Sequence, residues 1–579
     1  PSKEAINGVT AKFKWSEIKS DDMELSRVKG DISEMFPNQL SENFSDRIFH
    51  KLFKVIAKKD KILSGDKIIF IFGANDHGQT VQSYADPEHE IRVSSDVDGD
   101  GRYKGIDNSP RFSILPSQTV NLSGTSRSQV KIGDSFRLLV RAEDEFYNLQ
   151  RNFSGVVTIR DEHGESLKDI SLVGGIGSEM ISLNSLGPHR LRLSALAGDL
   201  TGRSNPIRVF NELPNEKLFW GDIHGHTGIS DGLGRSRNAY FLYGRDVAAL
   251  DVIALTDHGQ PDWRGNQLAA QKYNEPGKFV TILAQEAGAG LDHMNIYFRK
   301  DNMDHSKHWE TDYGKFQDSI CRQFNSTDNT AMTAPHHFSY SRRGKSAHRY
   351  PFGYWNSRVA RFVEVYSSHG ASEYPGNPRS LADPSDDYYK YMQGGLQKGL
   401  RFGVIGASDN HDSHPGRSGW GPYPNGLSAF WARDLTRNSI WDSLWNYRVY
   451  ATSFDRIYVE FRINGKNMGS QIITNDVAKI EGYVIGKTDD LRVSLVRDNE
   501  DLRTWSVDTG VLEFTFLDDL LSDQHFYYLR VTQSNGEQAW STPIWINSTV
   551  GEGASQEADE RNFDIELEKE PNDERQKMN

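Results

Sequence analysis

The most informative residues of this chain read Trp220-Gly221-Asp222-Ile223-His224-Gly225-His226-Thr227-Gly228-Ile229-Ser230-Asp231-Gly232. Two histidines stand one residue apart at the end of an apolar run, and a β-strand places side chains i and i+2 on the same face. Both imidazoles can therefore reach one metal ion. Asp231, in the Gly/Ser-rich turn that follows, could reach a second ion. The stretch predicts a strand whose carboxyl end binds metal.

The same order, an apolar β-type run and then a metal-binding residue type, recurs along residues 212–455. The predicted strands are Lys217–Trp220, Val252–Leu255, Phe279–Leu283, Asn295–Phe298, Met332–Ala334, Phe362–Tyr366, Phe402–Ile405 and Leu427–Trp431. Helix-length segments alternate with these runs, which favours βα units and a parallel sheet or barrel. Twelve of the 18 histidines lie between His224 and His414, so we expect the chemistry in this part of the chain.

In a (β/α) barrel, side chains at the C-terminal ends of different strands converge on one mouth. The candidates are His224, His226, Asp231, His258, Glu286, His336, His337, His369, Asp409 and His411. Each of them alone has the alternative of being a hydrogen-bonded polar residue in a loop. Together and without cations they would face large desolvation and like-charge costs, so the set predicts a multinuclear metal site. Strand alternation turns adjacent side chains to opposite faces, so we expect only one of His336 and His337 to bind metal.

The rest of the chain is mainly β in pattern. The predicted domains are a mixed, mainly β domain at 1–107, a β-sandwich at 108–211, the barrel at 212–455 and a C-terminal β-sandwich at 456–550. Residues 551–579 are charged, mostly acidic and nearly free of aromatic residues, which predicts a disordered tail. In the first domain, Phe49–Lys58 is typical of a short amphipathic helix and Lys67–Phe72 of a buried strand.

Composition excludes several classes of protein. The formal net charge of −13 disfavours a nucleic-acid polymer as partner, because phosphate binding wants a basic surface. One cysteine, Cys321, excludes an intrachain disulfide and a thiolate-rich zinc site. The chain has no apolar run of about 18 residues, so we expect no membrane span. A cytoplasmic location is favoured, and a periplasmic or secreted one after removal of a leader stays open.

The motifs resemble those of the PHP (polymerase and histidinol phosphatase) superfamily of metal-dependent phosphoesterases. The resemblance covers residues 212–455 and rests on D-x-H-x-H-T with the following S-D-G, on T-D-H, on the isolated glutamate after the third strand, on P-H and on S-D-x-H, in that order. The flanking domains resemble a branch of large PHP-like proteins of largely unassigned function. Family members often show A-H-P where this chain has Ala334-Pro335-His336-His337, so the local register departs from the family pattern.

The resemblance implies a multidomain fold of α/β plus all-β type, with a distorted (β/α)7 barrel flanked by β-sandwich-like domains. It implies a first ion held by His224, His226, Glu286 and Asp409. Glu286 would bridge to a second ion held with His336 or His337 and with His369, and Asp231, His258 and His411 would hold a third. Imidazole and carboxylate ligands without a thiolate suit Zn, Mn or Fe(II).

Other residues are candidates for catalysis or substrate binding. His293 could contact a substrate or act as an acid, and the alternative is that its role is structural. Arg417 could bind an anion, or it could simply lie in a solvated loop. The same two alternatives apply to the basic loop of Arg342, Arg343, Lys345, His348 and Arg349. Asp257 adjoins His258 and could orient an imidazole or cap the next helix.

A separate acidic loop lies near the N-terminus. Asp96, Asp98, Asp100 and Asp107 occupy positions 1, 3, 5 and 12 of this loop, with Gly101 at position 6. That spacing is typical of an EF-hand-type Ca²⁺ loop, although position 12 is Asp in place of Glu and a strand-like run precedes the loop. Structural calcium is one interpretation, and a polar hairpin rich in Asp-Gly turns is the other.

The predicted metal site indicates the reaction. Two cations about 3.5–4 Å apart can share a bridging hydroxide, lower its pKa and clamp the oxygens of a phosphoryl transition state. The sequence therefore favours a metal-dependent hydrolase, foremost a phosphoesterase acting on a small soluble phosphate ester. A metallohydrolase of an amide, lactone or sulfate ester is the second hypothesis, because the same hydroxide attacks those bonds. The third is a glycan- or protein-binding module with a relic site.

Overall fold

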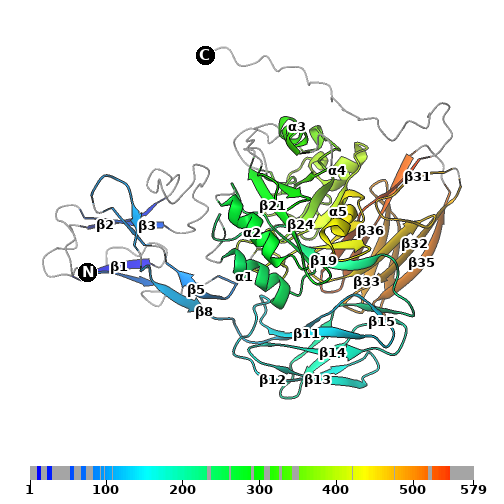
Figure 1. Cartoon of the computed structure of the whole chain (residues 1–579), viewed down its shortest axis with the longest axis horizontal. Coiled ribbons are helices and arrows are strands. Elements are labelled where there is room, and N and C mark those ends of the chain that lie inside the picture. Colours follow the sequence, from blue (N-terminus) through cyan, green and yellow to red (C-terminus); the bar gives the residue numbers. More distant parts are fainter. Residues whose placement is uncertain are drawn as a thin grey trace, which may run out of the picture. The chain divides into compact units, whose positions relative to one another are not determined.

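The chain divides into two compact units in the computed structural model, Pro1–Leu115 and Pro116–Asn579 (Figure 1). The structure describes residues 9–14, 23–28, 52–57, 67–72 and 82–547, with gaps at 92, 97, 107, 231, 233–235, 260–261, 289–292, 306–312, 325–328, 342–350, 420, 475 and 520–523. The tail predicted at 551–579 lies outside these residues.

Short antiparallel pairs make up the described part of the first unit. They are β1 (Val9–Lys14) with β4 (Lys67–Phe72), β2 (Met23–Val28) with β3 (Leu52–Ala57), β5 (Asp86–Glu90) with β8 (Arg111–Ile114), and β6 (Ser94–Ser95) with β7 (Lys104–Gly105). The strand predicted at Lys67–Phe72 is confirmed, whereas the helix predicted at Phe49–Lys58 is wrong. β3 includes the β-branched Val55 and Ile56, and its six residues pair in continuous register with β2, which outweighs a weak helical periodicity.

Two sheets pack face to face between residues 121 and 210. The larger has the order β13-β12-β16-β17-β9-β11-β14 and the smaller β10-β18-β15. Their bounds are β9 (Asn121–Thr125), β10 (Gln129–Lys131), β11 (Ser135–Glu143), β12 (Gly155–Arg160), β13 (Ser166–Leu172), β14 (Ile176–Ser182), β15 (Gly187–His189), β16 (Arg192–Ala195), β17 (Thr201–Ser204) and β18 (Ile207–Phe210). Alternate residues of β11, such as Leu138 and Val140, share one buried cluster with Val209 of the facing sheet.

A thirteen-stranded sheet connects the middle of the chain with its C-terminal part. Its main path is β23-β22-β21-β20-β19-β27-β28-β37-β36-β33-β34, with β31 and β38 beside it. The first seven are β19 (Lys217–Asp222), β20 (Val252–Leu255), β21 (Val280–Gly288), β22 (His293–Phe298), β23 (Ala331–Pro335), β27 (Leu427–Ala432) and β28 (Val449–Thr452). The others are β31 (Gln471–Ile473), β33 (Leu491–Arg497), β34 (Glu500–Val507), β36 (Gln524–Gln533), β37 (Gln538–Ser541) and β38 (Ile544–Asn547).

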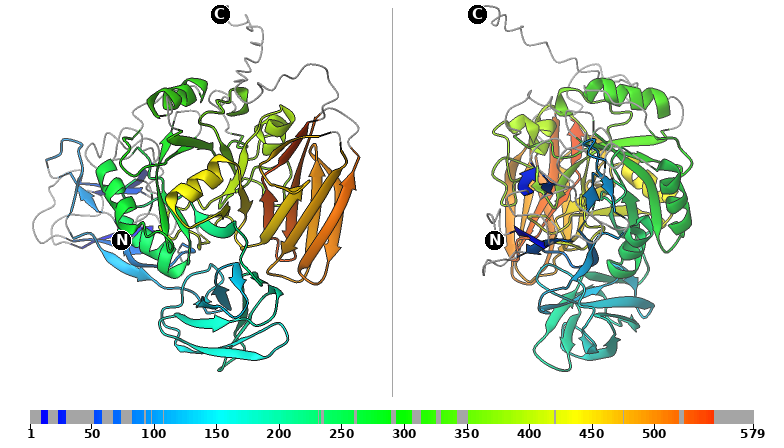
Figure 2. Two further views of the ribbon diagram at one scale, coloured as in Figure 1. Left: turned by 45° about the vertical axis from the view of Figure 1, so that its right-hand side comes forward. Right: turned by 90° about the vertical axis from the view of Figure 1, so that its left-hand side faces the viewer.

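Two smaller sheets complete the second unit, whose C-terminal strands are orange in Figure 2. One has the order β25-β24-β26, with β24 (Phe362–Ser367), β25 (Gly370–Ala371) and β26 (Gly403–Gly406). The other has the order β30-β29-β32-β35, with β29 (Tyr458–Ile463), β30 (Lys466–Asn467), β32 (Ala478–Ile485) and β35 (Val511–Asp518). A bridge between Thr333 and Ala360 joins β23 to the start of β24, and Gly426 N donates to Ala407 O (3.0 Å) between β26 and β27. The central strands thus form a nearly closed β-barrel.

The predicted (β/α)7 barrel is wrong, whereas a β-rich multidomain protein is confirmed. Among the described residues, 38 strands accompany five α-helices. The pairs β19–β20, β20–β21 and β24–β26 are parallel, but β21–β22, β22–β23, β19–β27 and β27–β28 are antiparallel. The physical reason is clearest after β21, because the segment 289–292 before β22 is too short for the crossover that parallel strands require.

The helices are short and cover parts of the strands. They are α1 (Arg237–Leu242), α2 (Trp263–Tyr273), α3 (Tyr313–Phe324), α4 (Met392–Gln397) and α5 (Arg437–Trp445), with a π-helical turn at Tyr243–Val247 and 3-10 turns at Pro351–Gly353 and Tyr388–Lys390. β20 is buried on both faces: Val252 packs in one cluster with Trp441 of α5, and Ile253 in another with Tyr240 of α1. Burial on both sides explains why β20 is a continuous apolar run.

Candidate metal centre

The candidate ligands gather where several strands of the barrel end. β19 leads to His224 and His226, β20 to His258, β21 contains Glu286, β23 leads to His336 and His337, β24 to His369, and β26 to Asp409 and His411. Backbone hydrogen bonds align these ends. His226 N donates to Asn410 O (2.9 Å) and Asp409 N to His224 O (2.9 Å), while Glu286 N donates to Thr256 O (3.1 Å). Segments far apart in sequence therefore present their side chains to one small volume.

Four buried side chains form the centre of this group. Nε2 of His224 lies 3.1 Å from Oε2 of Glu286 and 3.1 Å from Oδ1 of Asp409. Nε2 of His226 lies 3.1 Å from the same two oxygens. A single imidazole N–H serves one acceptor well, whereas a cation placed between the four atoms would satisfy all of them. The four residues expected to hold a first ion are thus together and can hold one.

The spacing of these donors suits a divalent metal. Metal–nitrogen and metal–oxygen bonds of about 2.0–2.2 Å put neighbouring ligand atoms of a tetrahedral or octahedral site roughly 3.0–3.5 Å apart. The separations of 3.1 Å lie in that range. Two imidazoles and two carboxylates without a thiolate suit Zn, Mn or Fe(II).

Glu286 and Asp409 also present their second oxygens to further imidazoles. Oε1 of Glu286 lies 3.1 Å from Nε2 of His336 and 3.7 Å from Nδ1 of His258, with His293 also in contact. Oδ2 of Asp409 lies 2.6 Å from Nε2 of His337 and 3.3 Å from Nε2 of His369. Both carboxylates are therefore placed to bridge two ions. The resemblance to the PHP superfamily implied such a bridge at Glu286 and paired His369 with it, whereas the structure places His369 against Asp409.

Both His336 and His337 turn into the cluster, although strand alternation would turn one away. His336 directly follows β23, while His337 has φ of 57°, in the left-handed region. Asp409 has φ of 50° and Ser413 has φ of 59°. Such conformations cost about 1–3 kcal/mol each for residues other than glycine, and they concentrate where function requires them. The backbone at His337 and Asp409 thus directs ligand side chains that a regular strand would point elsewhere.

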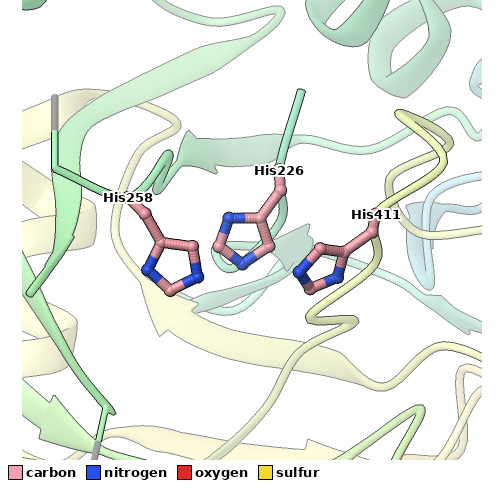
Figure 3. Close-up of side chains that lie close together, drawn as sticks. All are labelled: His226, His258 and His411. Atoms are coloured by element: carbon pink, nitrogen blue, oxygen red, sulfur yellow. The ribbon is translucent and has the colours of Figure 1, made fainter. Parts of the chain in front are cut away.

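A third imidazole group lies beside the central one. Figure 3 shows His226 between His258 and His411, with the three rings side by side. The ring centroids of His226 and His258 are 4.7 Å apart, and those of His226 and His411 are 4.3 Å apart. Their nitrogens lie close enough to hold one metal ion. Asp231, which the sequence places with His258 and His411, lies outside the described residues.

Burial and charge shift the protonation of this cluster. Burial opposes the charged form of Glu286, but His258, His293 and His336 hold its pKa well below the usual value. Burial likewise opposes ionisation of Asp409, and His224 and His337 keep its pKa low. Burial lowers the pKa of His224, yet Asp409 and Glu364 raise it well above the ordinary value. In the absence of cations the carboxylates thus favour a proton on His224, and metal binding there would release it.

Two buried acids that were not predicted as site residues support the cluster. Oε2 of Glu364, on β24, lies 2.7 Å from Nδ1 of His224, so it fixes which nitrogen of that ring faces Glu286. Asp222 accepts from the backbone N–H groups of Ser408 (3.0 Å) and Gly416 (2.6 Å), and burial raises its pKa to about 6. A carboxylate in the middle of the apolar run Phe362–Tyr366 was the available signal for Glu364.

The residues predicted for catalysis lie in three different places. His293 contacts Glu286 and belongs to the cluster. Asp257 accepts from Thr227 N (2.7 Å), Thr227 Oγ1 (2.8 Å) and Ser230 Oγ (2.8 Å), so it organises the loop after His226. Arg417 forms a bidentate ion pair with Glu143 of β11, so its guanidinium is directed to the sandwich.

The acidic loop before β7 is a hairpin tip between β6 and β7. Asp96 accepts from the backbone N–H groups of Gly99 (2.7 Å), Asp100 (3.2 Å) and Gly101 (3.0 Å). Asp100 accepts from Arg102 N, and Asp98 pairs with Lys104. Asp107 lies outside the described residues, as does the basic loop of Arg342, Arg343, Lys345, His348 and Arg349.

Comparisons with other proteins give similarity without an assigned activity. A family model described as "Protein of unknown function (DUF3604)" matches residues 407–488. The chain is 28% identical over 536 residues to an uncharacterized protein of Chlamydia pneumoniae, covering 83% of this chain and 84% of the relative. It is also 28% identical over 537 residues to an uncharacterized protein of Chlamydia trachomatis, covering 84% of each.

Solved structures show only distant likeness. An FMN-binding β-glucuronidase from Facaelibacterium prausnitzii matches with a TM-score of 0.14 and 11% identity over 75% of each chain. A TM-score this low does not establish a shared fold. Within the described residues, no helix combines the length and apolar character that crossing a membrane requires.

Proposed function

We propose that this protein is a metal-dependent hydrolase, foremost a phosphoesterase, whose site is organised by Glu286 and Asp409. The observation that supports this most is that each buried carboxylate presents its two oxygens to different imidazoles. Such carboxylates can bridge neighbouring cations, and clusters of two or three divalent ions are a common basis of hydrolysis.

The chain's own groups determine where that chemistry occurs. Bound divalent cations would lower the pKa of water and neutralise charge that develops on phosphoryl oxygens. Glu364 holds Nδ1 of His224, which keeps Nε2 of that ring toward Glu286 and Asp409. Asp222 ties the backbone at Ser408 and Gly416 to the end of β19, so the ligands on both segments stay in register.

One side of the cluster is more exposed to solvent than the other. The side chains of His224, His226 and Glu286 are fully buried, whereas those of His258, His293 and His369 are 18%, 22% and 23% exposed. A substrate would approach from that exposed side. His293 lies there beside Glu286, where an imidazole could donate a proton to a leaving group.

A phosphate ester is the favoured substrate because the ordered motifs of this chain resemble those of the PHP superfamily. The barrel gives no support to this substrate, because the predicted (β/α)7 barrel is wrong. Amides, lactones and sulfate esters remain the second class, since the same ligand set can activate water against them.

The test is hydrolysis by the full chain loaded with Mn²⁺ or Zn²⁺. The substrates are aryl phosphate monoesters and diesters, carboxylate esters, amides and aryl sulfates. We expect phosphate release that falls by at least about 100-fold in His226→Ala and Asp409→Asn, together with loss of bound metal.

His525→Ala is the matched control, because His525 also pairs with a carboxylate, Asp498, but does so near the start of β36. It should keep metal and activity. If the protein hydrolyses only substrates without phosphorus, it is a metal-dependent hydrolase of another class and not a phosphoesterase. If the fully metal-loaded protein hydrolyses no substrate of the panel, an enzymatic role for the cluster is contradicted.

A further inference from the structure

A second cluster of buried charge surrounds a cavity where the sandwich, the barrel and the C-terminal sheets meet. The cavity has a volume of about 30 Å³. The charged side chains that line it are Arg141, Arg417, Arg456, Lys487 and Asp455. A space of this size holds small solvent species when it offers several polar partners. Four cationic side chains and one acid at its surface indicate which kind of species fits.

The acids near this cavity are already occupied. Glu143, fully buried, accepts from both Arg141 and Arg417. Oδ1 of Asp455 accepts from Lys487 Nζ (2.9 Å), and Oδ2 accepts from Gln533 (3.0 Å) and Asn535 (2.8 Å). These acceptors therefore have little capacity left for the remaining donors.

Arg456 is the cation with the least compensation. It is 8% exposed, and Nη2 donates to the carbonyl oxygens of Ala248 (3.2 Å) and Ala249 (2.7 Å). It forms no ion pair with any carboxylate among the residues that the structure describes. Burial lowers the pKa of Arg456 to about 10, Asp251 opposes that change, and Arg141 and Arg417 add to it. A buried cation in this position needs a counter-charge.

The cavity also has spare donors. Ser123 Oγ and Thr125 Oγ1 both line it and both accept from Nη2 of Arg141, so their hydroxyl hydrogens are left to donate. The described hydrogen bonds of Arg417 use Nε and Nη2, which leaves Nη1. A water molecule must donate as well as accept, whereas an anion only accepts. Donors in excess therefore favour an anion.

We propose that this cavity is a binding site for a small inorganic anion of chloride size, held by Arg456, Arg417 and the hydroxyls of Ser123 and Thr125. The anion supplies a counter-charge in direct contact, which Asp251 does not provide because it forms no ion pair with Arg456 among the described residues. It also joins three parts of the chain, since the hydroxyls belong to β9, Arg456 precedes β29, and Arg417 follows the segment that contains Asp409 and His411. The site is separate from the metal cluster and does not depend on the proposed hydrolase activity.

The experiment measures thermal unfolding of the full chain in potassium chloride and in potassium gluconate at constant ionic strength. Gluconate is too bulky for the cavity. Chloride should raise the unfolding midpoint of the wild type by a few degrees, with saturation. Arg456→Gln should lose this chloride-specific shift.

Arg361→Gln is the matched control, because Arg361 also donates to backbone carbonyls, those of Ser357 and Trp445. Arg361 does not line this cavity, and it forms no ion pair among the described residues. It should keep the chloride shift. An equal shift in Arg456→Gln, or no chloride-specific shift in the wild type, would overturn the proposal.

Crystals soaked in bromide give a readout that does not depend on a folded variant. We expect one anomalous peak within the cavity of the wild type, in contact with Arg456. A cavity that contains only water under these conditions would overturn the anion site.

Discussion

Residues 409–417 connect two clusters of buried charge, because Asp409 belongs to one cluster and Arg417 to the other. The clusters differ in the basic side chains that contact their carboxylates. Around Glu286 and Asp409 the charged partners among the described residues are imidazoles. Around Glu143 the partners are the guanidiniums of Arg141 and Arg417. Imidazoles release a proton near neutral pH and then bind metal, whereas guanidiniums stay charged and donate hydrogen bonds.

The difference separates a ligand set from a structural ion pair. Both clusters desolvate carboxylates, so burial alone does not identify a functional site. The imidazole cluster can exchange its protons for divalent cations, which gives it chemistry. The arginine cluster holds β11 to the segment that follows His411, which gives it a role in stability and places Arg417 away from the metal ligands.

The largest effect should follow loss of a bridging carboxylate. Glu286→Ala and Asp409→Asn each remove a ligand that faces two groups of imidazoles, so we expect more than half of the bound metal to be lost. Asp231→Ala should cost less, because the sequence assigns it to a single ion. Elemental analysis of purified variants gives the metal content. Equal losses in Glu286→Ala and Asp231→Ala would contradict the bridging role of Glu286.

The arginine cluster should instead respond in stability. Glu143→Gln leaves Arg141 and Arg417 without their buried counter-charge, and breaking such a pair costs about 3–5 kcal/mol. Urea unfolding measures this change, and metal content of the folded protein should stay at the wild-type level. Glu212→Gln is the control, since Glu212 pairs with Lys131 at the surface and should leave stability almost unchanged. If folded Glu143→Gln loses metal, the arginine cluster supports metal binding, and the proposed separation of the two clusters is contradicted.

Glu364 tests whether a residue outside the ligand set tunes metal binding. Glu364→Ala removes the partner of His224 Nδ1 and should weaken metal affinity about 10–100-fold. Glu364→Gln keeps an acceptor oxygen and should recover part of that loss. Titration with a competing chelator measures the affinity. Identical behaviour of the two variants would show that the hydrogen bond to His224 does not matter.

The smallest expected effect is the pH dependence of stability that arises from Glu537, a buried carboxyl group beside Arg379. Burial raises the pKa of Glu537 to about 6, and Arg379 opposes that shift. The folded state then holds the proton more tightly than the unfolded state, so this group contributes stability below its unfolded pKa that is lost as pH rises toward 6. The stability of wild type relative to Glu537→Gln should fall by about 2 kcal/mol between pH 4 and 7. Urea unfolding at the two pH values measures the difference, and a constant offset would contradict the raised pKa.

Local patterns located the strands and most of the cluster. The predicted runs at 217–220, 252–255, 279–283 and 332–334 coincide with β19, β20, β21 and β23, because their apolar residues are buried wherever the strands pair. His224, His226, Glu286 and Asp409 were candidates because each comes within a few residues after such a run, and the resemblance to the PHP superfamily implied that they share one ion. Glu364 was missed because its carboxylate lies inside the run Phe362–Tyr366, whereas the candidate ligands were sought after the runs.

What the sequence alone determined is the position of the strands that lead to the site and the type of ligand that follows them, since both depend on neighbouring residues. Only the tertiary structure decided strand direction, the turn of His337 into the cluster and the pairing of Arg417 with Glu143. Direction depends on connection length and on partners distant in the chain, the turn depends on a positive φ, and the pairing joins residues 274 positions apart. Interactions of that range leave no local pattern, because the energy that selects them arises only when separate segments exclude water together.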